Sequence, residues 1–188
     1  MGGLVERIGP LDDASRRRGR PDDAYGSLVR TIVGQQLSTK AARTIYARLA
    51  ALFGDRAPTP AELITAEEQA LREAGLSRQK IRYLRDLAAR VQGGELDLNG
   101  LHELSDEEVA EKITAVKGLG RWSADMFLIF HLRRPDVLPV GDLGIRRAVK
   151  RLYGLPDLPD EDTLRTIADP WRPQRTLACL YLWKTLEE

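Results

Sequence analysis

Residues Thr114–Ala124 read T-A-V-K-G-L-G-R-W-S-A, and this stretch decides the fold of the chain. An apolar helical period ends near Val116, and Gly118 and Gly120 then allow a sharp backbone turn. A second helix is predicted from Ser123 onward. The free amide groups of its first turn would form an anion site of the kind that binds phosphate. A plain pair of helices joined by a glycine turn is the alternative interpretation.

Two basic residues, Lys117 and Arg121, flank this turn, and the later segment P-V-G-D-L-G-I-R-R carries a single acidic residue, Asp142. A helix is predicted directly after it, over residues 143–152. Asp is a favoured N-cap, so a purely structural role is one interpretation. A helix N-terminus also favours the ionised carboxylate, which suits a group that activates water or stabilises positive charge. A phosphate-binding hairpin followed by one acid indicates a protein that holds DNA and acts on it chemically.

The composition is that of an ordinary globular chain. Of its 188 residues, 43% are hydrophobic and 30% are charged, enough to bury a core in one domain or two small lobes. The longest apolar run, residues 124–132, is too short to cross a bilayer, and no signal peptide is recognisable. The single cysteine, Cys179, excludes an internal disulfide, a zinc finger and a four-cysteine iron–sulfur cluster. We therefore expect a cytoplasmic protein with no membrane partner.

The charges are unevenly distributed, although the formal net charge is only +1. Residues 95–111 hold seven acidic residues and no Lys or Arg, whereas residues 117–151 hold eight basic and three acidic residues. Polyanion binding depends on where cations gather rather than on their sum. The second segment therefore favours a nucleic-acid partner, with simply solvated helix faces as the alternative.

Apolar periodicity predicts an all-α fold. Apolar residues recur at helical spacing along residues 41–52 and again along residues 81–91. Capping-box signatures begin at Thr59, Thr65 and Ser105, where helices are expected to start. No segment alternates for long with the period of two that is typical of strands.

The first 20 residues lack this periodicity, and they include the basic run Arg16–Arg20. Chain ends are often poorly ordered unless packing holds them. We expect residues 1–20 to form an N-terminal arm and residues 21–188 to form the folded domain, with the hairpin over residues 105–132.

Three tryptophans accompany these motifs, although only 6% of the residues are aromatic. Trp122 lies in the hairpin, and Trp171 and Trp183 lie near the C-terminus. Tryptophan most often belongs to a core. Its ring is also the best stacking surface for an extruded base, above all a cationic one. Spacing leaves both roles open.

Four motifs follow one another along the chain: G-Q-Q-L-S at Gly34–Ser38, the hairpin A-V-K-G-L-G-R-W-S-A, the V-G-D that ends at Asp142, and W-R-P-x-R followed by Y-L-W at Trp171–Trp183. In this order they resemble the helix-hairpin-helix DNA glycosylases, most closely the 3-methyladenine DNA glycosylase II (AlkA-like) branch. The resemblance covers roughly residues 20–188.

The resemblance implies a two-lobed all-α fold with the active site in the cleft between the lobes. It implies an enzyme that flips a damaged nucleotide out of duplex DNA and hydrolyses its N-glycosidic bond, starting base excision repair. Alkylated bases such as 3-methyladenine and 7-methylguanine would be the substrates. We expect double-stranded DNA as the partner and a nucleoid-associated monomer as the acting species.

The resemblance also assigns roles to individual residues. Asp142 would be the catalytic carboxylate. The base pocket would be formed by Trp122, Trp183, Gln35, Met126 and Leu143. The loop that carries Gln36 and Leu37 would insert into the duplex. The remaining expected DNA contacts are Lys117, Gly118, Gly120, Arg121, Ser123 and Arg146. Backbone carbonyl groups that match a monovalent-cation site are those of Thr114, Val116 and Leu119.

Two differences from relatives narrow the expected chemistry. Bifunctional relatives carry a Lys where this chain has Trp122, so no Schiff-base nucleophile stands there. Other relatives carry a four-cysteine cluster that one cysteine cannot build. We therefore expect no cofactor and no strand cleavage. A glycosylase for oxidised or deaminated bases, a non-catalytic module that binds damaged DNA, and an all-α protein-interaction domain are the alternatives.

The pocket is expected to be wide and tolerant of varied alkylated bases. Met126 stands where relatives often have an aromatic residue, Leu143 and Gly144 stand where bulkier residues are common, and Gln174 replaces a frequent Trp. A purine methylated at N3 or N7 is cationic and leaves readily, so one ionised carboxylate is enough for the reaction.

Overall fold

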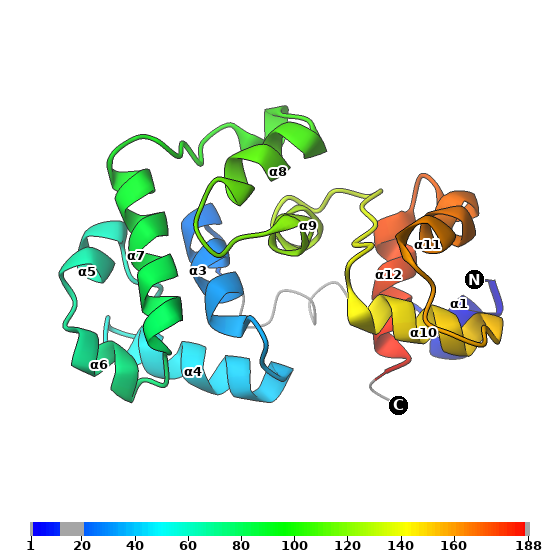
Figure 1. Ribbon diagram of the computed structural model, residues 1–188, viewed down its shortest axis with the longest axis horizontal. Coiled ribbons are helices and arrows are strands. Elements are labelled where there is room, and N and C mark those ends of the chain that lie inside the picture. Colours follow the sequence, from blue (N-terminus) through cyan, green and yellow to red (C-terminus); the bar gives the residue numbers. More distant parts are fainter. Residues whose placement is uncertain (1, 12–20, 187–188) are drawn as a thin grey trace. The chain divides into compact units, whose positions relative to one another are not determined.

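The computed structural model describes residues 2–11 and 21–186, and every regular element in these ranges is a helix (Figure 1). The predicted all-α class is therefore confirmed. The chain forms two compact units, and their boundary falls inside α9 (Arg121–Phe130), between Phe127 and Leu128. One unit, here called the hairpin unit, comprises the described residues 21–127. The C-terminal unit comprises residues 2–11 and 128–186.

Helix α7 (Arg78–Gln92) is central to the hairpin unit, because its predicted apolar stripe is buried at Ile81, Leu84 and Leu87. The helices α3 (Ala24–Gly34) and α5 (Pro60–Thr65) pack against it (Figure 1). These contacts bury the side chains that the sequence places at helical spacing, which is the main source of stability for such short helices.

The other elements of this unit complete its order along the chain. They are α4 (Thr39–Ala51), α6 (Glu68–Glu73), the short 3-10 helix η1 (Leu101–Glu103) and α8 (Asp106–Thr114). The predicted stripe along residues 41–52 is only partly a core. Leu49 is fully buried, whereas Leu52 is 47% exposed because α4 ends one residue before it.

Two of the three predicted capping boxes are confirmed. Thr59 and Ser105 each accept a backbone N–H three residues on, and the Glu at that position closes the box. The prediction at Thr65 is wrong, because α5 ends there and the Thr65 hydroxyl donates back to the carbonyl of Ala61 at 3.0 Å. Helix α6 instead starts after Glu67 without a side-chain cap.

The C-terminal unit is built around α10 (Leu143–Tyr153) and α12 (Arg175–Lys184), which pack together. Its other elements are α11 (Glu161–Ala168) and the 3-10 helix η2 (Asp169–Trp171). The core contains Ile145, Val149, Leu182, Cys179 and Trp171. Trp171 is therefore a core residue, in line with the more common role of tryptophan.

The described part of the N-terminal stretch is not an arm. Residues 2–8 form helix α1 (Gly2–Ile8), which packs against α12 and buries Leu4. The Tyr181 hydroxyl donates to the carbonyl of Gly9 at 3.0 Å and holds the end of α1 in place. The basic run Arg16–Arg20 lies outside the described residues. None of the described helices has the length and apolar character needed to cross a membrane.

Candidate functional site

The hairpin turn is shaped by Gly118, which packs directly on the ring of Tyr83. Gly118 has φ +81°, and a Cβ there would lie 2.1 Å from Tyr83 Cδ2, so only glycine fits. A Cβ on Gly120 would meet nothing within 4 Å. Helix α9 starts at Arg121, two residues before the predicted Ser123, and the Ala124 amide donates to the Gly120 carbonyl at 3.1 Å. The first-turn amide groups are therefore those of residues 121–123.

Lys117 is held to α7 through Asp86. The Lys117 amide donates to Asp86 Oδ2 at 3.0 Å, and Arg90 Nε donates to the same oxygen at 3.0 Å. Burial alone would raise the pKa of Asp86, but these two hydrogen bonds and the nearby cations hold it below its usual value. The result is a carboxylate that is charged at neutral pH and fixes the turn against α7.

Arg121 is engaged by carboxylates of its own unit. Its guanidinium pairs with both oxygens of Glu107 at 2.7 and 3.0 Å, and Nε donates to Asp125 Oδ1 at 3.1 Å. These hydrogen bonds, that to Glu107 first, raise the pKa of Arg121. Arg121 therefore joins α8 to α9. From the sequence we expect Arg121 to contact DNA, and these ion pairs were not predicted. The i, i+4 spacing of Arg121 and Asp125 was the available signal.

Gln35 connects the loop after α3 to the hairpin turn. Its Nε2 donates to the Gly118 carbonyl at 2.6 Å and lies 3.4 Å from Ser123 Oγ. Ser123 is only 2% exposed, and its hydroxyl faces Gln35 inside the unit. The expected contact of Ser123 with DNA stays a prediction, one that its backbone amide would make. Gln35, expected in a base pocket, serves here as a link between two surface features.

The loop between α3 and α4 presents Gln36 and Leu37 at the surface. Gln36 adopts the left-handed region with φ +58°, which is unusual for a residue with a side chain. Leu37 is an exposed large apolar residue, and its amide donates to the Gly34 carbonyl at 3.2 Å. Such local strain is typical of functional loops. The geometry agrees with a loop that meets a partner.

Asp142 is the N-cap of α10, and two donors fix one of its oxygens. The Ile145 amide donates to Oδ1 at 2.8 Å, and Trp183 Nε1 donates to the same atom at 3.0 Å. The residue is 9% exposed. The predicted cap is confirmed, and the carboxylate is held in one orientation by both a helix N-terminus and a ring.

Trp183 is itself held by a neighbour. Its ring stacks on Phe130 with centroids 5.7 Å apart and planes at 25°. A Cβ on Gly144 would lie 3.0 Å from Asp142 Oδ1 and 3.3 Å from Trp183 Cδ1. The absence of a side chain at Gly144 therefore makes room for Asp142 and Trp183. The expectation that it widens a base pocket stays a prediction.

The other predicted residues fall in two groups. Trp122 and Met126 lie on α9 in the hairpin unit, where Trp122 is 38% exposed. Leu143 lies beside Asp142 and is 45% exposed. Arg146, one turn along α10, donates from Nε to the carbonyl of Pro159 at 2.8 Å and so holds the loop before α11. The predicted active site between lobes stays a prediction.

The family model of the "HhH-GPD superfamily base excision DNA repair protein" matches residues 29–173. The chain belongs to this superfamily. The match contains the loop of Gln36, the whole hairpin and Asp142, and thus most of the features described above.

Known relatives of this HhH-GPD chain include alkylation-repair proteins. It is 37% identical over 165 residues to DNA-3-methyladenine glycosylase 1 of Schizosaccharomyces pombe, covering 87% of this chain and 72% of that protein. The S. pombe glycosylase in complex with abasic DNA superimposes with a TM-score of 0.90 at 34% identity, covering 100% of this chain and 91% of that one. A DNA-3-methyladenine glycosidase of Bacillus halodurans gives a TM-score of 0.81 at 40% identity, covering 97% and 82%.

The monovalent-cation site expected at the hairpin of this HhH-GPD chain stays a prediction. Val116 O accepts the Leu119 amide at 3.1 Å, whereas the described backbone hydrogen bonds include none to the carbonyl oxygens of Thr114 or Leu119. Neutral carbonyl oxygens with unused lone pairs are ligands that hard cations prefer. No cluster of acidic, His or Cys side chains that could hold a metal occurs in the described ranges.

Proposed function

We propose that this chain is a monofunctional DNA glycosylase that acts as a monomer and hydrolyses the N-glycosidic bond of alkylated bases in duplex DNA, including 3-methyladenine and 7-methylguanine. The observation that carries the proposal is Asp142, a nearly buried carboxylate oriented by two N–H donors. It is supported by the likeness to the S. pombe 3-methyladenine glycosylase. The product, an abasic site, would start base excision repair.

The reaction would use Asp142 on the sugar rather than on the base. The methylated purine is cationic, so it leaves with the electron pair of the bond to C1′ and becomes neutral. The sugar is then positively charged at C1′, and the carboxylate stabilises that charge. Asp142 accepts a proton from the water whose oxygen bonds to C1′, and later releases it to solvent.

Base recognition would rest on aromatic faces. A cationic ring stacks favourably on indole, and Trp122 and Trp183 offer such surfaces. Trp183 would have a second task, because its Nε1–H already holds Asp142. Met126, Leu143 and Gln35 belong to the same proposal as pocket residues.

DNA binding would rest on the hairpin and the loop before it. The amide groups of residues 121–123, with Gly118 and Gly120, would receive one backbone phosphate without reading sequence, and Lys117 would contact the DNA backbone beside it. A monovalent cation on the carbonyl groups of Thr114, Val116 and Leu119 would add positive charge at that phosphate. Gln36 and Leu37 would fill the space that a flipped nucleotide leaves.

Strand cleavage is not expected of this chain. Cleavage by bifunctional relatives needs an amine that forms a Schiff base with the sugar. An indole at residue 122 cannot form one, and Lys117 is tied to the turn through its amide and Asp86.

The decisive experiment measures base release from methylated duplex DNA by wild type and Asp142→Asn. We expect the variant to keep its affinity for abasic duplex and to lose release of 3-methyladenine and 7-methylguanine. Wild-type release by Asp142→Asn would reduce Asp142 to a helix cap. Duplexes containing uracil or 8-oxoguanine test the alternative substrates, and borohydride trapping of the enzyme on DNA would contradict the monofunctional reaction.

A further inference from the structure

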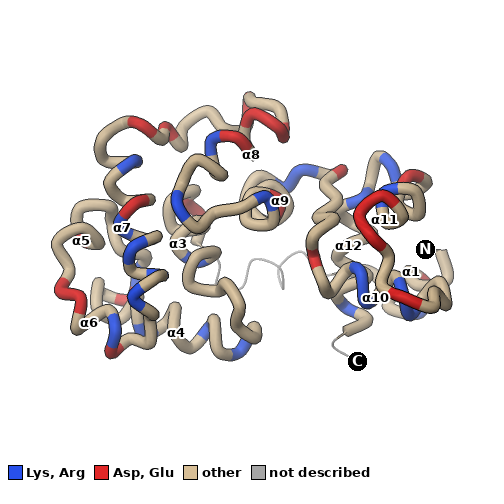
Figure 2. The backbone as a smooth tube through the Cα atoms, viewed as in Figure 1, with Lys and Arg blue, Asp and Glu red and all other residues tan. Residues whose placement is uncertain are grey.

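A cationic cavity of about 560 Å³ lies beside the hairpin turn, on the side of α7. Its lining residues are Arg82, Tyr83, Arg85, Asp86 and Lys117. Three cations against one carboxylate give a local formal charge of +2. Figure 2 shows the basic residues that follow one another along α7. A cavity of this charge favours an anion.

The carboxylate in this cavity is already saturated. Asp86 accepts from the Lys117 amide and from Arg90, and Lys117 Nζ lies 3.8 Å from its other oxygen. Arg85 is also engaged, because it donates to the carbonyl of Ala66 at 2.9 Å and lies 3.9 Å from Glu68. Neither residue needs a ligand, and neither repels one strongly.

Arg82 differs from these neighbours. Its side chain is exposed, and its guanidinium forms no hydrogen bond or ion pair with any residue of the described ranges 2–11 and 21–186. The Lys117 side chain is 75% exposed, although its Nζ lies 3.8 Å from Asp86 Oδ1. The cavity therefore has two cationic side chains that face solvent, one from α7 and one from the turn.

The floor of the cavity is rigid. The Tyr83 ring is in contact with Gly118 on one side, and its hydroxyl accepts from Gln79 Nε2 at 2.5 Å. Arg82 is the sequence neighbour of Tyr83, and Lys117 is the neighbour of Gly118. The contact between ring and glycine thus fixes the backbone at Arg82 and at Lys117 relative to each other.

We propose that Arg82 and Lys117 together bind one backbone phosphate of the DNA strand that the hairpin holds, adjacent to the phosphate received by the amide groups of α9. This rests on the proposed binding of DNA by the hairpin. Arg82 supplies planar donors and Lys117 a compact charge, a combination that suits a phosphodiester. A phosphate contact positions the duplex and carries no information on sequence or damage.

The test compares Arg82→Ala, Arg82→Lys and wild type by fluorescence anisotropy with an undamaged duplex over a range of salt concentrations. Loss of one phosphate contact lowers the slope of log K against log salt by about 0.9. We expect a measurable part of this loss for Arg82→Ala, since Lys117 still contacts the phosphate, and a retained slope for Arg82→Lys. The matched control is Arg72→Ala, which removes an exposed Arg from α6 of the same unit and should leave the slope unchanged.

Methylphosphonate substitution along the strand locates the contact. Wild type should lose affinity at the contacted position, and Arg82→Ala should lose clearly less affinity than wild type at that position alone, because only Lys117 still contacts the phosphate. An unchanged slope in Arg82→Ala, or an effect restricted to damaged duplex, would overturn the proposal. Because undamaged DNA is the probe, a wild-type chain that released no base would refute the proposed activity and leave this measurement intact.

Discussion

The hydrogen bond from Trp183 to Asp142 offers a sharp test of how the carboxylate is positioned. Trp183→Phe removes the Nε1–H that donates to Asp142 Oδ1 at 3.0 Å and leaves an aromatic ring that can still stack on Phe130. If the ring matters only as a stacking surface, phenylalanine should largely replace it. If the N–H positions the carboxylate, base release should fall.

The expected loss of base-release rate follows from the hydrogen bond that is removed and from the donor that remains. A hydrogen bond to a charged group contributes about 1.5–3 kcal/mol. Each 1.4 kcal/mol or so corresponds to about tenfold in rate. The single-turnover rate of base release should therefore fall roughly 10- to 100-fold in Trp183→Phe. The loss should not be complete, because the Ile145 amide still donates to the same oxygen at 2.8 Å.

The assay measures release of 7-methylguanine under single-turnover conditions with enzyme in excess, together with the Kd for abasic duplex and the Tm. Trp171→Phe is the matched control, since it replaces another tryptophan of the same core without touching Asp142. We expect the affinity for abasic duplex to change little in either variant. A Trp183→Phe variant that releases base as fast as wild type would refute the positioning argument.

Two further predictions concern the hairpin. Gly118→Ala should lower the free energy of unfolding by more than about 1 kcal/mol, because the left-handed backbone disfavours a side chain and the new Cβ would lie 2.1 Å from Tyr83. Chemical denaturation checks this, and an unchanged midpoint would contradict it. The hydrogen bonds from Lys117 and Arg90 depress the pKa of Asp86 below its unfolded value of about 3.9, so their stabilisation is present above that pH and is lost as the pH falls through the folded value. Between pH 6 and pH 3 wild type should therefore lose more stability than Asp86→Asn, and parallel losses would contradict this.

Much of the fold could be predicted because it depends on local patterns. The stripe of α7, the boxes at Thr59 and Ser105 and the cap at Asp142 are confirmed, since each is set by residues within a few positions. The prediction of a capping box at Thr65 was wrong for a local reason too. Its hydroxyl bonds back into the preceding helix turn, an option that the same four-residue pattern allows.

The site was less predictable because its contacts join distant residues. Gln35 meets Gly118 across 83 positions and Trp183 meets Asp142 across 41, and no periodicity reports such pairs. The burial of Ser123 follows from the same packing. The helix at residues 2–8 was missed because it has little apolar surface of its own and is stabilised by α12.

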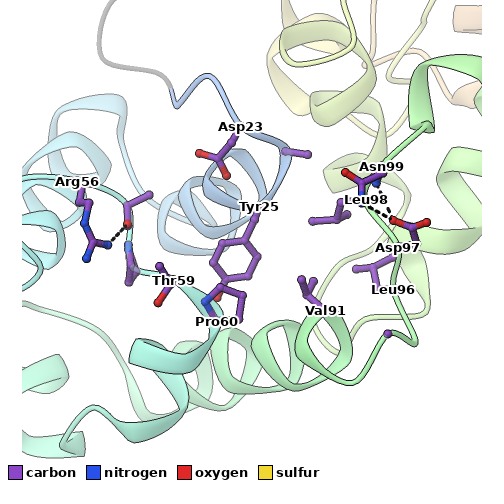
Figure 3. Close-up of a pocket in the computed structure, with 14 residues that line it drawn as sticks. Asp23, Tyr25, Arg56, Thr59, Pro60, Val91, Leu96, Asp97, Leu98 and Asn99 are labelled. Carbon is purple, nitrogen blue, oxygen red and sulfur yellow. Dashed lines mark hydrogen bonds between the residues drawn. The ribbon is translucent and has the colours of Figure 1, made fainter.

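Figure 3 shows a second cavity, which lies in the hairpin unit. Its shape alone does not make it a candidate for the reactive site. That cavity of about 870 Å³ is lined by Tyr25, Arg56 and Leu98 among others, far along the sequence from Asp142. Arg56 there is occupied by Glu62, with 2.5 and 2.8 Å between their polar atoms. The proposed chemistry rests on the oriented carboxylate of Asp142 and not on this cavity.

Gly144 has a consequence for any attempt to change which bases are released. An alanine there would press on Asp142 Oδ1 at 3.0 Å and on Trp183, so it would disturb the proposed catalytic carboxylate before it altered the fit of a base. Leu143, one position earlier, is 45% exposed and can be exchanged without that penalty. Redesign of substrate range should therefore vary residue 143 and keep residue 144 as glycine.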